Sequence, residues 1–175
     1  MATVVVGLGS NLGDRMGFLR SGIEGLIRGG VVGTELSSVY ETPPIGYLQQ
    51  PNFLNMVLMG RTALDPESFF SLLRSVEDES GRERSFPNAP RTLDLDLVFF
   101  SGWIVRDAGL CVPHPRWKER SFVVRPLAEI APDLRDPETG WSIRDVARFW
   151  PMEPSVIEVV EGTAAFRALL EEGVG

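Results

Sequence analysis

Two aspartates, Asp94 and Asp96, alternate with leucines in the run Thr-Leu-Asp-Leu-Asp-Leu-Val over residues 92–98. Successive strand side chains point to opposite faces, so this alternation predicts both carboxylates on one face and the leucines toward the core. Their Cα atoms would lie roughly 6.6 Å apart, which lets both carboxylates converge on one or two hard cations. A bare Asp-x-Asp is more often a solvated strand face. Here it follows an arginine-rich loop, and the repulsion between adjacent acids favours a cation such as the Mg²⁺ of a nucleotide.

Positive charge gathers in residues 113–122, which hold the only histidine, His114, and the only lysine, Lys118, with Arg116 and Arg120. In a chain of net charge −7, this cluster can bind phosphate oxygens. The alternative is a solvated loop and helix start. Because His114 stands between two prolines, a satisfied core histidine is the weaker interpretation. No Gly-Lys-Ser/Thr loop exists, so guanidinium groups are the available phosphate ligands.

A third group combines a proline turn, an aromatic ring and an amide. Residues 42–45, Thr-Pro-Pro-Ile, exclude helix and sheet pairing at the two prolines and predict a stiff, exposed loop as far as Pro51. Phe53 can stack on a flat ring, and the Asn55 amide can read the donor and acceptor edge of a heterocycle. Each has a simpler interpretation, Phe53 as a core residue and Asn55 as the partner of a neighbouring turn.

The elements that must position these residues follow the order β-α-β-β-α-β. Strands are predicted over residues 3–8, 31–41, 53–61 and 91–100, and helices over residues 15–28 and from Pro66, with Asp65 as N-cap, to Gly81. The strand over residues 53–61 is apolar on both faces and is expected to be central. This order predicts an α+β fold with a ferredoxin-like antiparallel sheet and helices on one face.

The residues after 100 predict additional elements that could cover the second face. We expect a short strand over residues 110–113, a helix over residues 122–130 around Pro126, another helix opening at Ser142, and a strand and terminal helix over residues 153–172. No linker or repeat divides the chain. We therefore expect one domain over residues 1–175, with residues 153–175 as a C-terminal extension packed on the core.

The composition is that of a soluble globular protein, with 43% hydrophobic residues and 17 basic against 24 acidic side chains in 175 residues. The excess of acid argues against nucleic-acid binding. No apolar run reaches the roughly 20 residues of a membrane helix, and the first residues lack the basic start of a secretory signal. The single cysteine, Cys111, excludes an intramolecular disulfide and suits a reducing compartment. We expect a cytoplasmic monomer that binds neither nucleic acid nor membranes.

Taken together, these groups resemble the 6-hydroxymethyl-7,8-dihydropterin pyrophosphokinase family of folate biosynthesis over nearly the whole chain. The stretches that carry the resemblance are residues 9–13 (Gly-Ser-Asn-Leu-Gly), 38–46 (Ser-Val-Tyr-Glu-Thr-Pro-Pro-Ile-Gly), 50–55 (Gln-Pro-Asn-Phe-Leu-Asn), 90–96 (Pro-Arg-Thr-Leu-Asp-Leu-Asp), 113–115 (Pro-His-Pro), Arg120-x-Phe122 and 126–132. The resemblance implies a ferredoxin-like enzyme that moves the β,γ-pyrophosphoryl group of ATP to the pterin's hydroxymethyl oxygen and releases AMP.

The resemblance also implies roles for individual residues. Asp94 and Asp96 match the ligands of two Mg²⁺ ions and, with Arg82 and Arg91, the catalytic set. The pterin site is matched by Thr42, Pro43, Pro44, Ile45, Phe53, Asn55 and Phe122, in which the two phenylalanines sandwich the ring. The ATP site is matched by Glu77, Arg84, Arg91, Leu97, His114 and Arg120. The chain departs from the family pattern at Arg74, Asn88, Gly109 and Cys111, positions that concern ATP affinity and loop closure.

Two other classes compete with this interpretation. A noncatalytic ferredoxin-like module could sense a pterin or nucleotide, but it would not need Asp94 and Asp96 beside Arg82 and Arg91. A two-metal phosphohydrolase would require further acidic or histidine ligands, and the chain has one histidine. The product of ATP turnover, whether AMP, ADP or free phosphate, discriminates between these classes.

Overall fold

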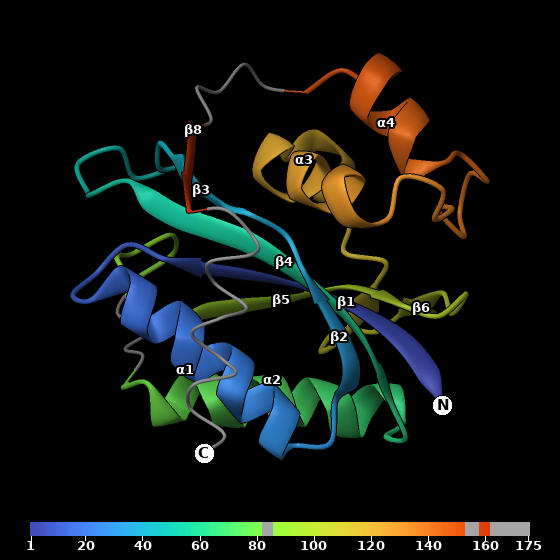
Figure 1. The fold of residues 1–175 in the computed structure, drawn as a ribbon, viewed down its shortest axis with the longest axis horizontal. Helices are drawn as coiled ribbons and strands as arrows, with labels where there is room; N and C mark the ends of the chain where they lie inside the picture. The colour runs from blue at the N-terminus through green and yellow to red at the C-terminus, as the bar shows by residue number, and fades with distance from the viewer. Residues whose placement is uncertain (82–85, 153–157, 162–175) are drawn as a thin grey trace.

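A six-stranded antiparallel sheet lies at the centre of the computed structural model, which describes residues 1–81, 86–152 and 158–161 (Figure 1). The strands are β1 (Ala2–Ser10), β2 (Val32–Leu36), β3 (Val39–Thr42), β4 (Phe53–Thr62), β5 (Asp94–Phe100) and β8 (Glu158–Glu161). They are ordered β5, β1, β4, β3, β8, and β2 also pairs with β4. Both the predicted ferredoxin-like α+β fold and the central position of β4 are confirmed.

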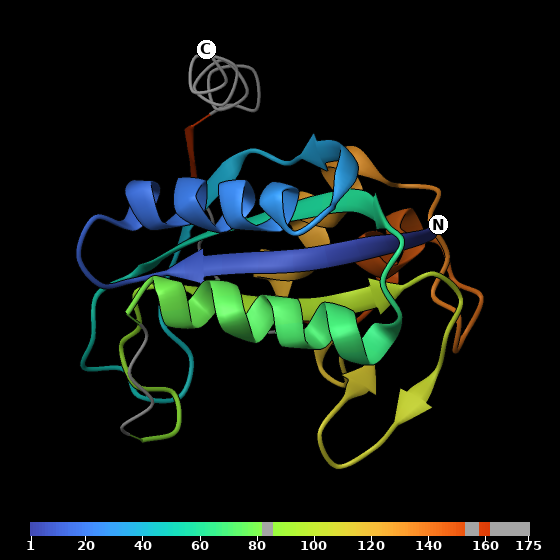
Figure 2. The same cartoon turned by 90° about the horizontal axis from the view of Figure 1, so that it is seen from below.

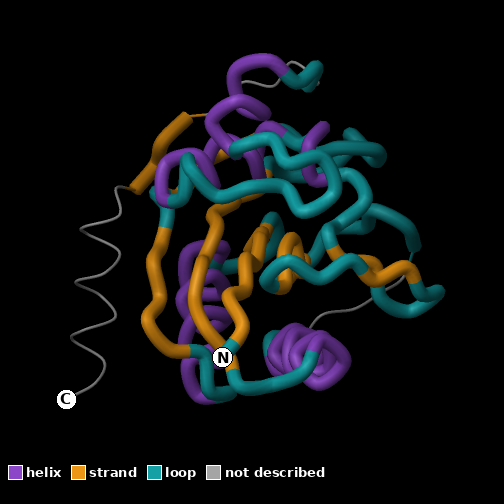
Figure 3. Tube along the Cα trace, turned by 90° about the vertical axis from the view of Figure 1, so that its right-hand side faces the viewer, coloured by secondary structure: helices purple, strands orange, loops and turns teal. Residues whose placement is uncertain are grey.

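Helices cover both faces of the sheet. On one face lie α1 (Arg15–Arg28) and α2 (Pro66–Glu79), which run side by side (Figure 2), and on the other lie α3 (Ser121–Ile130) and α4 (Ile143–Phe149). Figure 3 shows the strands between these two helical layers. Side chains of β1 therefore alternate between two cores, with Val4 and Val6 toward α1 and α2 and Val5 toward α3 and α4. Burial on both faces explains why the central strands are continuously apolar.

The helices α2 and α4 begin at the N-cap residues that the sequence predicts. The Asp65 carboxylate accepts a hydrogen bond from the backbone N–H of Ser68 at 2.8 Å, and Pro66 occupies the first turn of α2. At the start of α4, the Ser142 hydroxyl accepts from the N–H of Asp145 at 3.2 Å. The described helices include none that is long and apolar enough to cross a membrane.

The strand predicted over residues 31–41 is wrong as a single element. It is divided into β2 and β3 at Ser37, whose N–H donates to the Val57 carbonyl at 3.0 Å while its hydroxyl accepts from the Val57 N–H at 2.8 Å. The side chain thus replaces a backbone group in pairing with β4. Gly33, with φ of 60°, lies within a further register shift of β2.

Smaller differences occur after residue 100. The short strand expected near residue 111 is β7 (Cys111–Val112), and it pairs with β6 (Val105–Arg106), which the sequence did not predict. A 3₁₀ turn, η1 (Trp117–Glu119), precedes α3. The expected C-terminal strand is present as β8, which pairs with β3. The helix predicted after it lies outside the described residues, as do Arg82 and Arg84.

Candidate active site

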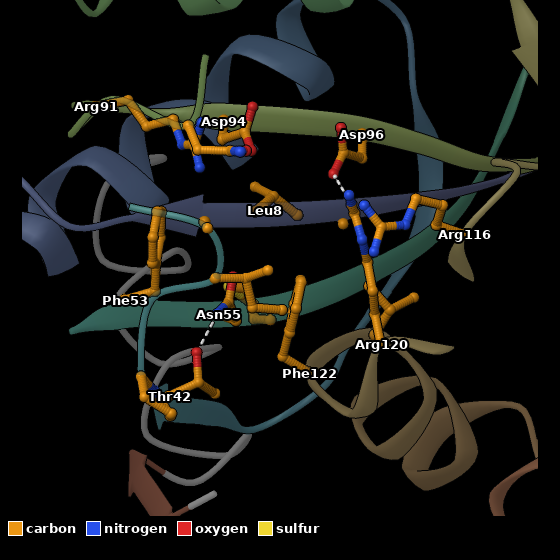
Figure 4. Close-up of a pocket in the computed structure, with 18 residues that line it drawn as sticks. Leu8, Thr42, Phe53, Asn55, Arg91, Asp94, Asp96, Arg116, Arg120 and Phe122 are labelled. Carbon is orange, nitrogen blue, oxygen red and sulfur yellow. Dashed lines mark hydrogen bonds and ion pairs between the residues drawn. The ribbon is translucent and has the colours of Figure 1, made fainter. Parts of the chain in front are cut away.

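A cavity of about 450 Å³ opens on the α3 side of the sheet, at the ends of β1 and β4 (Figure 4). Its floor includes Gly7 and Gly9 of β1, which pair across the sheet with Asp96 and Asp94 of β5. A Cβ atom at Gly9 would lie 2.6 Å from Oδ1 of Asn55, so only glycine leaves room for that amide. Gly9, which pairs with Asn55 on one side and with Asp94 on the other, therefore keeps the space between these two side chains open.

Two aromatic rings flank this cavity. Phe53 begins β4, Phe122 lies in the first turn of α3, and Figure 4 shows the rings on opposite sides of the cavity with Asn55 between them. Phe53 is 7% exposed, so the core interpretation holds for part of its surface, yet the ring still borders the cavity. The arrangement can receive a flat ring system between two aromatic faces.

The amide of Asn55 is held in place by Thr42. Nδ2 of Asn55 donates a hydrogen bond to Oγ1 of Thr42 at 2.7 Å, and both side chains are buried. The simpler interpretation of Asn55, as a partner of the neighbouring turn, is thus correct as far as it goes. Pro43 and Ile45 also line the cavity, whereas Pro44 does not. Because the amide is oriented by one neighbour, it can present a defined edge to a heterocycle.

Asp94 and Asp96 lie at the junction of two cavities. They line the cavity described above and also a second one of about 280 Å³ at the outer edge of β5. The leucines between and after them, Leu95 and Leu97, are about 5% and 4% exposed, as the alternation predicts. Because β5 is an edge strand, its carboxylates are reachable from both sides.

Each carboxylate is accompanied by an arginine that also lies over one of the two rings. Nε of Arg91 is 3.7 Å from Oδ2 of Asp94, and the Arg91 guanidinium carbon lies 5.0 Å from the centre of the Phe53 ring. Correspondingly, Nη1 of Arg120 donates to Oδ2 of Asp96 at 3.2 Å, with the guanidinium carbon 5.6 Å from the Phe122 ring. Cation–π contact and ion pairing together hold both guanidinium groups at the rim of the ring site.

The electrostatics of this junction favour a cation. Burial, followed by the negative charge of Asp94, raises the pKa of Asp96 to about 7, against the opposing effect of Arg120. A divalent cation would relieve that repulsion. Among the described residues no group of three or more acidic, histidine or cysteine side chains surrounds a single point. Two carboxylates completed by water and phosphate oxygens are the usual environment of Mg²⁺, so the residues present fit this ion.

The walls of the second cavity are partly apolar and partly charged. It is lined by Phe70, Arg74 and Glu77 of α2, by Leu95 and Leu97 of β5, and by Leu110, Cys111, His114 and Pro115. Glu77 is 3% exposed, and its Oε2 accepts from the Leu95 N–H at 3.4 Å. The family resemblance implies one site for Glu77, Leu97 and His114, and all three line this cavity.

His114 is held as a neutral imidazole. Burial, and then the nearby positive charge of Arg120, lowers its pKa to about 4. Nδ1 accepts a hydrogen bond from the backbone N–H of Arg116 at 3.1 Å, so the ring hydrogen is on Nε2. At neutral pH, His114 can therefore donate a hydrogen bond through Nε2 without carrying charge.

The predicted cationic cluster of residues 113–122 is partly wrong. Its lysine does not line either cavity: Nζ of Lys118 lies 3.0 Å from Oδ2 of Asp136, which is fully buried. Several residues that line the first cavity had no assigned role, among them Leu8, Asn88 and Arg116. Arg116 stood within the charged cluster, and Asn88 adopts a positive φ of 58°, which asparagine tolerates better than most residues do.

Comparisons with known proteins cover the same residues. A family model described as 7,8-dihydro-6-hydroxymethylpterin-pyrophosphokinase matches residues 5–132, which include every described residue that lines the two cavities. A 2-amino-4-hydroxy-6-hydroxymethyldihydropteridine pyrophosphokinase of Bacillus subtilis is 40% identical over 157 residues, which cover 89% of this chain and 94% of that protein.

Other similar proteins are longer. The folic acid synthesis protein fol1 of Pneumocystis carinii is 41% identical over 80% of this chain, but the match covers 19% of that protein. The solved structure of Plasmodium falciparum HPPK-DHPS superposes with a TM-score of 0.65 at 13% identity, over 84% of this chain and 44% of that one. The structural likeness concerns the fold.

Proposed function

Because the chain belongs to the 7,8-dihydro-6-hydroxymethylpterin-pyrophosphokinase family, we propose that it transfers the β,γ-pyrophosphoryl group of ATP to the hydroxymethyl oxygen of 6-hydroxymethyl-7,8-dihydropterin. The products are the pterin diphosphate and AMP, in a step of folate biosynthesis. The observation that carries the proposal is the position of Asp94 and Asp96, which line a cavity bordered by two aromatic rings on one side and a second, smaller cavity on the other. In this proposal each of the two cavities receives one of the two substrates.

In this proposal the pterin lies between Phe53 and Phe122, with its polar edge toward Asn55 and the backbone of residues 42–45. The bond from Asn55 to Thr42 fixes the orientation of the amide before the pterin binds, which lowers the entropic cost of recognition. The hydroxymethyl group then points toward the two carboxylates. ATP occupies the second cavity, with its base among the apolar walls and its phosphates toward the same carboxylates.

Asp94 and Asp96 are the residues that would hold Mg²⁺. When bound, the ion supplies positive charge that neutralises the phosphates and aligns the triphosphate. The number of ions, two in this proposal, follows the family resemblance.

The transfer exchanges one phosphorus–oxygen bond for another. The hydroxymethyl oxygen forms a bond to the β-phosphorus and releases its proton to solvent, while the bond from the β-phosphorus to the oxygen of the α-phosphate breaks and its electron pair leaves with AMP. Arg91 and Arg120, held at the rim by their aspartates and rings, can donate to phosphate oxygens on which negative charge develops. The Nε2–H of His114 supplies a neutral donor in the nucleotide cavity. Arg82 and Arg84 are assigned to the phosphates from the family pattern alone.

The test is the product of ATP turnover with Mg²⁺ and the pterin alcohol. We expect one AMP for each pterin diphosphate formed, with neither ADP nor free phosphate. Saturable binding of both ligands without AMP would support a sensor module instead, and phosphate release without the pterin would support a hydrolase. Asp96→Asn serves as the inactive control.

We also propose that the protein works as a single domain over residues 1–175, as a monomer in the cytoplasm, and without nucleic-acid or membrane partners. The net charge of −7 supports the exclusion of nucleic acid. Sedimentation of the purified chain at micromolar concentration tests the monomer.

A further inference from the structure

The cavity between the two phenylalanines is lined by a third guanidinium group, that of Arg116, to which the proposed reaction assigns no role. Its described lining residues include Arg91, Arg116 and Arg120 but only two carboxylates, Asp94 and Asp96. Arg91 and Arg120 are the arginines beside those carboxylates. Figure 4 shows the Arg116 side chain pointing from its own loop toward Arg120 and Asp96. Two guanidinium groups on one side of a cavity repel each other unless an anion lies between them.

The backbone of Arg116 is held in place. Its N–H donates to Nδ1 of His114 at 3.1 Å, and the next residue, Trp117, is 1% exposed and packs edge-on against Phe99 with 4.9 Å between ring centres. Arg116 thus projects from a rigid base on the wall of the cavity. An anion that binds there meets a side chain whose point of attachment is already ordered.

Glu119, the ion-pair partner of Arg116, competes only weakly with such an anion. Nε of Arg116 lies 3.4 Å from Oε2 of Glu119, and both side chains are 56% exposed. Exposed pairs of this kind contribute little to stability because water and salt screen them. Glu119 does not line the cavity. A phosphate group with two or more negative charges would therefore displace Glu119 from the guanidinium group of Arg116.

The position of Arg116 indicates which phosphate it meets. Arg116 lines the cavity of the aromatic rings and is absent from the described lining of the smaller cavity, where His114 and Glu77 lie. On the proposed function, a phosphate group that stays in the aromatic cavity after AMP has left is one that is attached to the pterin. We propose, on the basis of the proposed function, that Arg116 binds the diphosphate group after its transfer to the pterin. Arg116 then recognises the pterin diphosphate in preference to the pterin alcohol.

The experiment is a titration of the full chain, in the presence of Mg²⁺, with the pterin alcohol, the pterin diphosphate and AMP separately. Arg116→Ala should weaken binding of the pterin diphosphate about tenfold, as expected for one charge-assisted hydrogen bond. Binding of the alcohol and of AMP should change by less than about twofold. Arg116→Lys should restore part of the lost affinity because it keeps the charge but not the planar fork.

Two variants control for the loss of charge and of the surface pair. Arg144→Ala removes an arginine from another exposed ion pair, with Asp133, and should leave all three affinities unchanged. Glu119→Gln releases Arg116 from its partner and should keep or strengthen binding of the diphosphate. Melting curves of all variants report whether they fold.

Several results would overturn the inference. Equal weakening of all three ligands by Arg116→Ala would assign the residue to the fold, selective loss of AMP would move it to the nucleotide, and unchanged diphosphate binding would leave it without this role. These outcomes differ from failure of the proposed function, in which the unaltered chain binds neither pterin and forms no AMP. That failure would overturn both proposals.

Discussion

Arg120, which caps the start of α3, donates a hydrogen bond to Asp96 of β5, with 3.2 Å between Nη1 and Oδ2. This bond connects the helical layer that carries Phe122 to the edge strand that carries the carboxylates. The same guanidinium lies over the Phe122 ring. The ring site and the phosphate site are therefore connected through one side chain, and the variants below separate their contributions.

Asp94→Asn and Asp96→Asn should each abolish AMP formation and leave the fold intact. Each substitution removes a hard anionic ligand, and it also removes repulsion between the two acids. Thermal unfolding should therefore occur at the same or a higher temperature than in the unaltered chain. Mg²⁺-dependent AMP formation near the normal rate in both variants would contradict the assignment of the cation site.

The stability of the metal-free protein should depend on pH through Asp96. Its pKa is raised from 3.8 to about 7, so between these values the folded protein holds a proton that the unfolded chain releases. Raising the pH across this window therefore destabilises the fold. His114, whose lowered pKa is about 4, acts in the opposite direction between about 4 and its ordinary value of 6.5.

The comparison that isolates Asp96 is the difference in unfolding free energy between the unaltered chain and Asp96→Asn. This difference should favour the variant increasingly as pH rises from about 4 to 7, because the His114 contribution is common to both. Urea titrations in a chelating buffer measure it. A difference independent of pH would show that Asp96 is ionised throughout.

Phe122→Ala should weaken pterin binding by about 2 kcal/mol, roughly thirtyfold in Kd, from the lost stacking contact and the area it buries. ATP binding should change much less. Phe149→Ala, in which a 61% exposed ring of α4 is removed, is the matched control. Calorimetry with each ligand separately decides the matter, since equal losses for both ligands would mean that Phe122 supports the fold.

Arg91→Ala should impair both binding and chemistry. Its backbone is anchored, since its N–H donates to Oδ1 of Asn11 at 2.9 Å and its carbonyl accepts from the Asn11 N–H at 3.2 Å. Arg82 lies outside the described residues, and the hypothesis from the sequence is that it contacts the ATP phosphates mainly in the transition state. Arg82→Ala should lower kcat with small changes in Kd.

Single-turnover kinetics beside equilibrium titrations test this contrast between the two arginines, because slow product release can hide a chemical defect. If Arg82→Ala weakens ATP binding as much as it slows the single turnover, Arg82 does not act selectively in the transition state.

Lys118→Met should destabilise the fold by about 3 kcal/mol, because it leaves the fully buried carboxylate of Asp136 without its cation. The KM for ATP should not change, since Lys118 lines neither cavity. Chemical denaturation measures the loss of stability, and steady-state kinetics measures the KM for ATP. A raised KM with unchanged stability would contradict this prediction and assign Lys118 to phosphate binding.

Patterns within single elements allowed much of the fold to be predicted from sequence. The β-α-β-β-α-β order, the N-cap at Asp65 and the outward carboxylates of β5 depend on periodicity and on local hydrogen bonds, which neighbouring residues determine. The division at Ser37 was not visible, because its side chain replaces a backbone partner on a strand about twenty residues away.

The same distinction applies to the candidate site. Sequence alone selected Asp94, Asp96, Phe53, Asn55 and the charged segment around His114 as candidates, because their residue types can carry the chemistry wherever they lie. Only the tertiary structure decided that Lys118 turns to buried Asp136 while Arg116 turns to the cavity, although the two are separated by one residue. A side chain's partner depends on the charges that other elements bring near it, and α3, β5 and the loop before η1 meet only in the folded chain.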